Sequence, residues 1–251
     1  MFRAKRTFAV SLILLVSTAA GLLAGTGGLR MGDHLMKRGD YIEALEEYRK
    51  VLDREPENPE ALWRTGWALT MNALDESGNT RHEHLEEATN KINRAVVASP
   101  DNPDVHLAYA RALGHLALFK PDWDDYRVAR RVREELLIVL EEEPENPEAI
   151  FLTGMWHRWV SPAPLLKRKP KGVGAADIDS ALIYFRRAAS LDEDNLYYRY
   201  HLAKAYETTG AEPQAREIYR ELAAMEEVPR KYAGIPAEAE SELQTLEAET
   251  E

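Results

Sequence analysis

Histidines and carboxylates are the side chains best able to carry chemistry in this sequence, because the chain has no cysteine. His82 and His84 are two positions apart, so on a helix their side chains would diverge and would not share a metal ion. His106 and His115 would be separated by about 13 Å of helix rise, which is too far for one metal ion. We therefore expect these histidines to be ordinary polar side chains.

Patterns that signal known catalytic or nucleotide-binding sites are missing from the sequence. It has no phosphate-binding loop, no Gly-x-Ser-x-Gly, no His-Glu-x-x-His and no dinucleotide glycine pattern. The lack of cysteine also removes disulfides, thiolate metal sites and cysteine nucleophiles. The sequence predicts neither an enzyme nor a cofactor. An enzyme whose active site is formed by carboxylates from separate helices is the third hypothesis, after two non-catalytic ones.

The bulk composition suits a folded helical body and an acidic surface. The 251 residues are 45% hydrophobic and 30% charged, with a net charge of −11. A general nucleic-acid-binding protein needs a clustered basic surface. We therefore expect no nucleic-acid partner.

The N-terminus has the sequence pattern of an export signal. Arg3, Lys5 and Arg6 precede 23 uncharged residues, 7–29. This pattern predicts that residues 1–24 are a secretory signal peptide or an uncleaved N-terminal membrane anchor. In either case we expect the body to lie in the periplasm or another extracytoplasmic space, either secreted or held at the membrane.

One short polar string recurs at intervals of 44 residues, at positions 56–61, 100–105 and 144–149. In the first copy, Pro56 cannot continue a helix, and Asn58 is a good cap for the next one. Pro59 then takes the first helical position, where its missing N–H costs little. Each copy therefore predicts the end of one helix and the start of another. Asn195 is a weaker fourth copy.

Two further patterns recur between these stops. A small residue recurs in the first helix of each unit, at Gly32, Gly66, Ala110, Gly154 and Ala203. A small and large pair recurs in the second helix, at Ala44/Tyr48, Ala88/Ile92, Val132/Leu136, Ala181/Phe185 and Ala215/Tyr219. Together they resemble the tetratricopeptide repeat, which has a period of 34 residues.

The resemblance implies an all-α fold, a right-handed solenoid of about five tetratricopeptide helix pairs in residues 25–232. The units are expected near 25–58, 59–102, 103–146, 147–195 and 196–229. Residues 233–251 are expected to form a C-terminal capping helix.

Extra residues between the paired helices explain the longer periods. The insert at 74–83 contains a turn, the insert at 118–127 lengthens the second helix of the third unit, and the insert at 162–176 is Pro- and Gly-rich and is expected to be a loop. The basic run 167–171 either contacts phosphate groups of anionic lipid or is a mobile solvated loop.

A narrower resemblance rests on these inserts together with "ALWRTGWALTMNA", "YARALGHLAL" and "VREELLIVLEEEPENPEAIFLTGMWHRWV". Residues 33–245 resemble the regulator of microtubule dynamics family and its bacterial relatives. The resemblance implies a non-catalytic helical domain, tied in some eukaryotic members to membrane contact sites and lipid handling. A looser resemblance is to exported tetratricopeptide partners of bacterial solute transporters.

The repeat resemblance also implies which residues of the first helices line the concave face. They are Trp63, Arg64, Trp67, Met71, Leu107, Arg111, His115, Phe151, Met155, Arg158, Trp159, Tyr197, Tyr200, His201 and Lys204. Aromatic residues with arginine are typical of binding hot spots, and so much apolar surface needs a reason. The alternative is that the inserts or the C-terminal helix fold over these rings and bury them as core.

Two functions remain from this reasoning. The first is an exported scaffold that binds a partner protein or peptide on the concave face. The second is a carrier of a lipid or another apolar small ligand that serves an envelope transport system. A carrier needs a closed apolar cavity, whereas a peptide site needs an open groove with polar rims.

Overall fold

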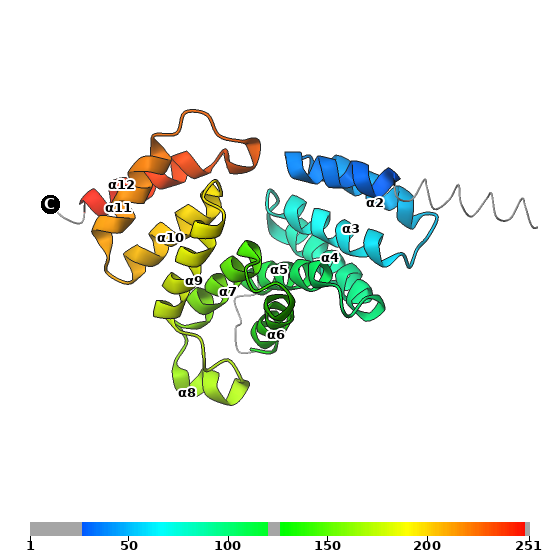
Figure 1. The fold of residues 1–251 in the computed structure, drawn as a ribbon, viewed down its shortest axis with the longest axis horizontal. Helices are drawn as coiled ribbons and strands as arrows, with labels where there is room; N and C mark the ends of the chain where they lie inside the picture. Colours follow the sequence, from blue (N-terminus) through cyan, green and yellow to red (C-terminus); the bar gives the residue numbers. More distant parts are fainter. Residues whose placement is uncertain (1–26, 120–125, 249–251) are drawn as a thin grey trace, which may run out of the picture. The chain divides into compact units, whose positions relative to one another are not determined.

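The computed structural model describes residues 27–119 and 126–248, and all its regular elements are helices (Figure 1). Residues 27–38 form the first described helix. The helices that follow are α2 (Tyr41–Leu52), α3 (Pro59–Ala73), α4 (Gly78–Ala98), α5 (Pro103–Phe119), α6 (Arg127–Glu142), α7 (Pro147–Val160), α8 (Leu165–Arg168), α9 (Ile178–Leu191), α10 (Leu196–Thr208), α11 (Glu212–Ala223) and α12 (Ile235–Ala248). Short 3-10 turns occur at Lys169–Lys171 (η1) and Arg230–Tyr232 (η2). The predicted all-α class is confirmed.

Some predictions lie outside the described residues. They are the export signal at 1–24, positions 120–125 of the second insert, and the last three positions of the predicted capping helix, 249–251. None of the helices in the described ranges is long and apolar enough to cross a membrane.

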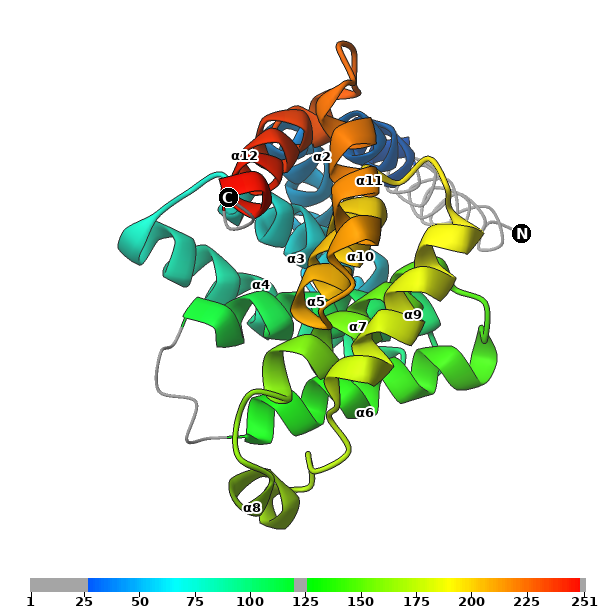
Figure 2. The same cartoon turned by 90° about the vertical axis from the view of Figure 1, so that its left-hand side faces the viewer.

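The chain divides into two compact units by its internal contacts, with unit 1 ending at Ala98 and unit 2 beginning at Ser99. In unit 1, α3 packs against both α2 and α4. In unit 2, consecutive helices form hairpins, α5 with α6, α7 with α9, and α10 with α11 (Figures 1 and 2). This succession of antiparallel helix pairs is the arrangement expected for tetratricopeptide repeats.

The asparagines of the repeated string cap the helices as predicted. The Asn58 side chain accepts a hydrogen bond from the backbone N–H of Ala61 at 3.0 Å, and Asn146 accepts one from Ala149 at 2.9 Å. Asn102 accepts from the Asp104 N–H at 3.0 Å. Since each cap satisfies an otherwise unpaired N–H of the next helix, the string fixes where α3, α5 and α7 begin. The weaker copy differs, because the Asn195 side chain makes no cap hydrogen bond.

The small residues of the first helices allow close packing of the second helices. A Cβ atom added at Gly32 would lie 2.2 Å from the Tyr48 ring, and one added at Gly66 would lie 2.4 Å from the side chain of Ile92. Tyr48 and Ile92 are fully buried. The predicted pairs of the second helices are therefore core residues, all of them at most 7% exposed.

The insert at 162–176 is more ordered than the predicted loop. It contains α8 and η1, and Val173 within it is fully buried in the core of unit 2. The Arg168 guanidinium donates to the carbonyl oxygens of Ala163 at 2.6 Å and Ala176 at 2.5 Å. Because one buried side chain is bonded near both ends of the insert, this segment is a folded projection.

Candidate functional site

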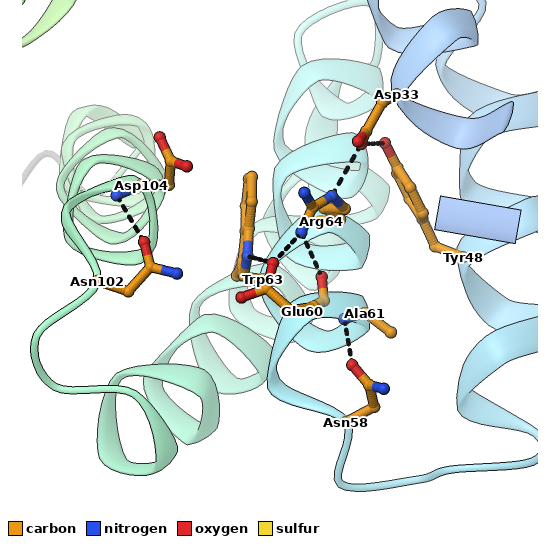
Figure 3. A network of polar contacts seen from close by, with 9 residues as sticks. All are labelled: Asp33, Tyr48, Asn58, Glu60, Ala61, Trp63, Arg64, Asn102 and Asp104. Carbon is orange, nitrogen blue, oxygen red and sulfur yellow. Dashed lines mark hydrogen bonds and ion pairs between the residues drawn. The ribbon is translucent and has the colours of Figure 1, made fainter. Parts of the chain in front are cut away.

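Arg64 of α3 is the centre of a polar network in unit 1 (Figure 3). Its Nε donates to Asp33 Oδ1 at 2.8 Å, and its Nη1 pairs with the Glu60 carboxylate. Tyr48 also donates to Asp33, at 2.8 Å, and burial raises the pKa of this phenol, so it remains a neutral donor. The cation at position 64 is therefore neutralised by two carboxylates of its own unit.

The aromatic residues of α3 pack on this network and on the core of unit 1. The rings of Trp63 and Trp67 are stacked with centroids 5.9 Å apart, and the Arg64 guanidinium lies 4.2 Å from the Trp63 ring centroid. Trp63 is only 6% exposed. Trp67 and Met71 are half-buried against the cluster that contains Leu69. These predicted binding residues thus contribute to the packing of unit 1.

In unit 2, α7 and α10 bring a second set of the predicted residues together. Phe151 lies 5.3 Å from the ring of His201 and 4.7 Å, in a stacked arrangement, from the ring of Tyr198. Tyr200 meets His201 edge-on at 5.5 Å. Phe151 and Trp159 are both half-buried against the hydrophobic cluster that contains Phe185. The structure therefore brings together Phe151, Tyr200 and His201 of the predicted set, with Tyr198, which was not predicted.

Arg158 and His201 make the polar contact on this face. The distance from Arg158 Nη1 to His201 Nδ1 is 3.1 Å. A guanidinium has only donors, so the imidazole nitrogen must be the acceptor and His201 must be neutral. Desolvation, with the nearby charges of Arg158 and Lys204, lowers the pKa of His201 to about 3. Arg158 is half-buried, and among the described residues no carboxylate pairs with it.

The C-terminal helix contacts the far end of this face. Glu242 of α12 pairs with Lys204 at 3.0 Å and accepts a hydrogen bond from Tyr200 at 3.2 Å. Lys204 is also paired with Glu207 at 3.1 Å. The charge of Lys204 is therefore compensated, unlike that of Arg158.

The other predicted residues of unit 2 have structural partners. Arg111 pairs with Glu148 at the start of α7. Leu107 packs on a core cluster, and His115 is half-buried and has an interaction partner. Met155, at 6% exposure, packs with Phe185 in the core and not on an open surface. Tyr197 is 43% exposed and lies 5.4 Å from the ring of Tyr232.

A buried network near the start of α5 was not identified from the sequence. His106 Nδ1 lies 2.5 Å from the Glu135 carboxylate, and its Nε2 lies 2.7 Å from the Pro100 carbonyl oxygen. Arg131 pairs with the same carboxylate at 2.5 Å, although Glu135 is fully buried. The hydrogen bond to Glu135 raises the pKa of His106, since the imidazolium satisfies both acceptors. Arg131 and Glu135 are four residues apart on α6, but nothing in the sequence pairs them with His106.

The histidines considered as metal ligands have separate partners. His82 pairs with Glu86 at 3.2 Å, and His84 pairs with Glu76 at 2.7 Å. Within residues 27–119 and 126–248, no group of three or more ligating side chains is placed to hold a metal ion.

The capped helix pairs and the close-packed small residues define a helical-repeat protein of the tetratricopeptide type. The family model of regulator of microtubule dynamics proteins 1–3 matches residues 29–247. The chain therefore belongs to this family.

Curated relatives are similar to the chain over much of its length. It is 25% identical to regulator of microtubule dynamics protein 1 of Bos taurus over 73% of the chain, and 26% identical to protein 3 of the same species over 62%. The matches span 59% and 35% of those two proteins, so the chain covers only part of each relative.

Solved structures agree with the fold. A thermophilic tetratricopeptide repeat protein of Thermus thermophilus matches with a TM-score of 0.64 at 17% identity, over 88% of this chain and 98% of that one. The structure of MamA MSR-1 C2 matches with a TM-score of 0.50 at 17% identity, over 80% of this chain and 98% of that one. At this level of identity the likeness shows the helical solenoid fold alone.

Proposed function

We propose that this protein is a non-catalytic scaffold that binds a partner protein through the α7–α10 face of unit 2. We define this face by Phe151, Arg158, Trp159, Tyr200 and His201. The tetratricopeptide fold and the family membership support a protein-interaction role. The N-terminal sequence supports export of the scaffold, either secreted or anchored at the membrane.

We choose this face because the charge of Arg158 is not neutralised by a carboxylate of the described residues. Arg64, Arg111 and Lys204 are each neutralised by a carboxylate of their own unit. Arg158 instead donates to a neutral imidazole. A half-buried cation without a counter-ion attracts an anionic group, and the surrounding rings offer apolar contact. The face therefore fits a peptide segment with an Asp, a Glu or a C-terminal carboxylate beside a large apolar residue.

A peptide-display selection on the full chain tests this function. We expect enriched peptides to combine one acidic group with a neighbouring aromatic or aliphatic residue. Arg158→Gln should weaken their binding by about tenfold to 100-fold, because it removes a charge-assisted hydrogen bond. Arg64→Gln is the matched control and should leave the affinity unchanged. Equal losses in both variants, or enrichment without acidic residues, would contradict the assignment.

Native mass spectrometry of the same full chain distinguishes the scaffold from the lipid carrier. A scaffold should give the mass of the protein or of a complex with another chain. A reproducible excess of lipid size, lost on denaturation, would favour the carrier. If the scaffold assignment holds, Arg158→Gln should reduce the amount of the complex with another chain, because it weakens partner binding.

A further inference from the structure

The insert between α7 and α9 is a basic segment of an acidic protein. Residues 162–176 contain four cations, Lys167, Arg168, Lys169 and Lys171, and no carboxylate, whereas the whole chain carries −11. Arg168 is buried, but the three lysines are exposed. No carboxylate among the described residues pairs with these lysines. The insert therefore presents three uncompensated positive charges to solvent.

Two adjacent leucines are exposed beside these lysines. Leu165 is 54% exposed and Leu166 is 89% exposed. Leu166 is the most exposed large hydrophobic residue in the described part of the chain. Such apolar side chains are unfavourable in water and usually mark a contact surface when they occur together. Their position in α8, directly before the lysines, joins apolar and positive groups in one short segment.

Hydrogen bonds and a buried side chain hold the insert in a folded form. The Arg168 side chain ties the carbonyl oxygens of Ala163 and Ala176 together, and Val173 anchors the segment in the core. Gly172 adopts a left-handed backbone conformation, φ 78°, at the end of η1. Figures 1 and 2 both show α8 at the tip of a projection from the helices of unit 2.

We propose that this projection docks on the surface of an anionic lipid bilayer. The lysines match the negative headgroup layer, and the leucines match the apolar region just below it. An acidic protein would account for the lysines, but it would not need two protruding leucines. The proposal does not depend on the partner suggested for the α7–α10 face, because the two surfaces share no residue.

A single fluorescent label can test the docking, since the chain contains no cysteine of its own. Leu166→Cys in the full chain would carry an environment-sensitive dye. Vesicles of phosphatidylcholine and phosphatidylglycerol in a ratio of roughly 3:1, which gives an anionic surface, should shift the dye emission to the blue. Vesicles of phosphatidylcholine alone should have little effect.

Two matched variants separate docking by the insert from binding by another segment. The same dye at Leu137→Cys on α6, another exposed leucine at 50%, should not respond, even if the N-terminus holds the protein on the vesicle. Replacing the three lysines by glutamine in the Leu166→Cys protein should raise the anionic lipid needed for the response by about 100-fold.

Each contrary result would overturn the proposal. These results are a silent label at position 166, equal responses at positions 137 and 166, or a response that survives the loss of the lysines. A response to soluble polyglutamate but not to vesicles would identify an acidic protein as the occupant instead. Failure of the peptide-display experiment would leave this test unaffected, so the two proposals can fail separately.

Discussion

The α3 face of unit 1 and the α7–α10 face of unit 2 carry the same kinds of side chain but use them differently. In unit 1, Arg64 lies against Trp63 and is neutralised by Asp33 and Glu60. In unit 2, Arg158 has only the neutral His201 as its polar side-chain partner among the described residues. The first arrangement satisfies its cation internally and stabilises the unit. The second leaves a positive charge available for an anion.

The comparison teaches that residue type alone does not identify a binding surface in a repeat protein. The first helices of two repeats, α3 and α7, each hold an arginine with aromatic neighbours. The difference comes from the neighbouring carboxylates, which in unit 1 are Glu60 of the same helix and Asp33 of the first described helix. The following predictions test this contrast, beginning with the helix packing that places each face.

Gly66 of unit 1 should be more sensitive to substitution than Gly154 of unit 2, because helix packing is tighter at Gly66. A Cβ atom at Gly66 would lie 2.4 Å from Ile92 and 2.8 Å from the backbone oxygen of Ala88, whereas one at Gly154 would lie 2.9 Å from the Phe185 ring. We expect Gly66→Ala to lower the free energy of unfolding by about 3 kcal/mol and Gly154→Ala by about 1 kcal/mol. Urea unfolding followed by circular dichroism measures both values.

Gly114 provides the control for these substitutions. It lies in α5, and an added Cβ would meet nothing within 4 Å. Gly114→Ala should therefore be neutral or should stabilise by up to about 1 kcal/mol, through helix propensity. Equal effects at Gly66 and Gly114 would mean that close approach does not set the packing of α3.

Most of the helix organisation could be predicted from the sequence because it depends on local signals. Asn58 and Asn146 cap their helices through hydrogen bonds three residues away, and the cap requires no distant partner. The pairs of the second helices follow a helical period, which also belongs to one segment. Such signals predict helix ends and core residues well.

The pairing of charged side chains in and around the candidate site could not be predicted, because the partners are far apart in the sequence. Arg64 is joined to Asp33, Lys204 to Glu242, and His106 to Glu135, and no pattern in the sequence links these positions. Arg168 differs, because its carbonyl partners, Ala163 and Ala176, are only five and eight residues away, near the two ends of the insert. The composition of that insert indicated a loop, whereas one buried guanidinium makes it a folded projection.

Two histidines of unit 2 should give opposite pH dependences. The pKa of His201 is lowered to about 3, so its neutral form stabilises the fold above its unfolded pKa of about 6.5, and this contribution declines as the pH falls toward 3. Between pH 6.5 and pH 5, wild type should lose about 1.5 kcal/mol of unfolding free energy relative to His201→Gln. Urea unfolding over a pH series provides the measurement.

His106 should show the reverse behaviour. Its pKa is raised by the hydrogen bond to Glu135, so the imidazolium stabilises the fold fully below the unfolded pKa, and the contribution is lost as the pH rises through the folded value. Glu135, the Pro100 carbonyl and the more distant positive charge of Arg131 are the groups that set this pKa. The advantage of wild type over His106→Gln should be larger at acidic than at alkaline pH. The same trend in both histidine variants would show that one of the two assignments is wrong.

The smallest effect, and the most direct test of the contrast between the units, concerns the two arginines. Arg64→Gln leaves Asp33 and Glu60 without their cation, and we expect a loss of about 1 kcal/mol in unfolding free energy. Arg158→Gln removes a cation that no carboxylate of the described residues neutralises, so its effect should stay within about 0.5 kcal/mol of zero.

The pKa of His201 gives a second measurement for the same pair of variants. The positive charge of Arg158 contributes to the low pKa of His201, so NMR titration should show this pKa rising in Arg158→Gln and unchanged in Arg64→Gln. A large loss of stability in Arg158→Gln, with an unchanged His201 pKa, would mean that Arg158 has a structural role like that of Arg64. The α7–α10 face would then have no charge left for a partner, and the contrast between the two units would disappear.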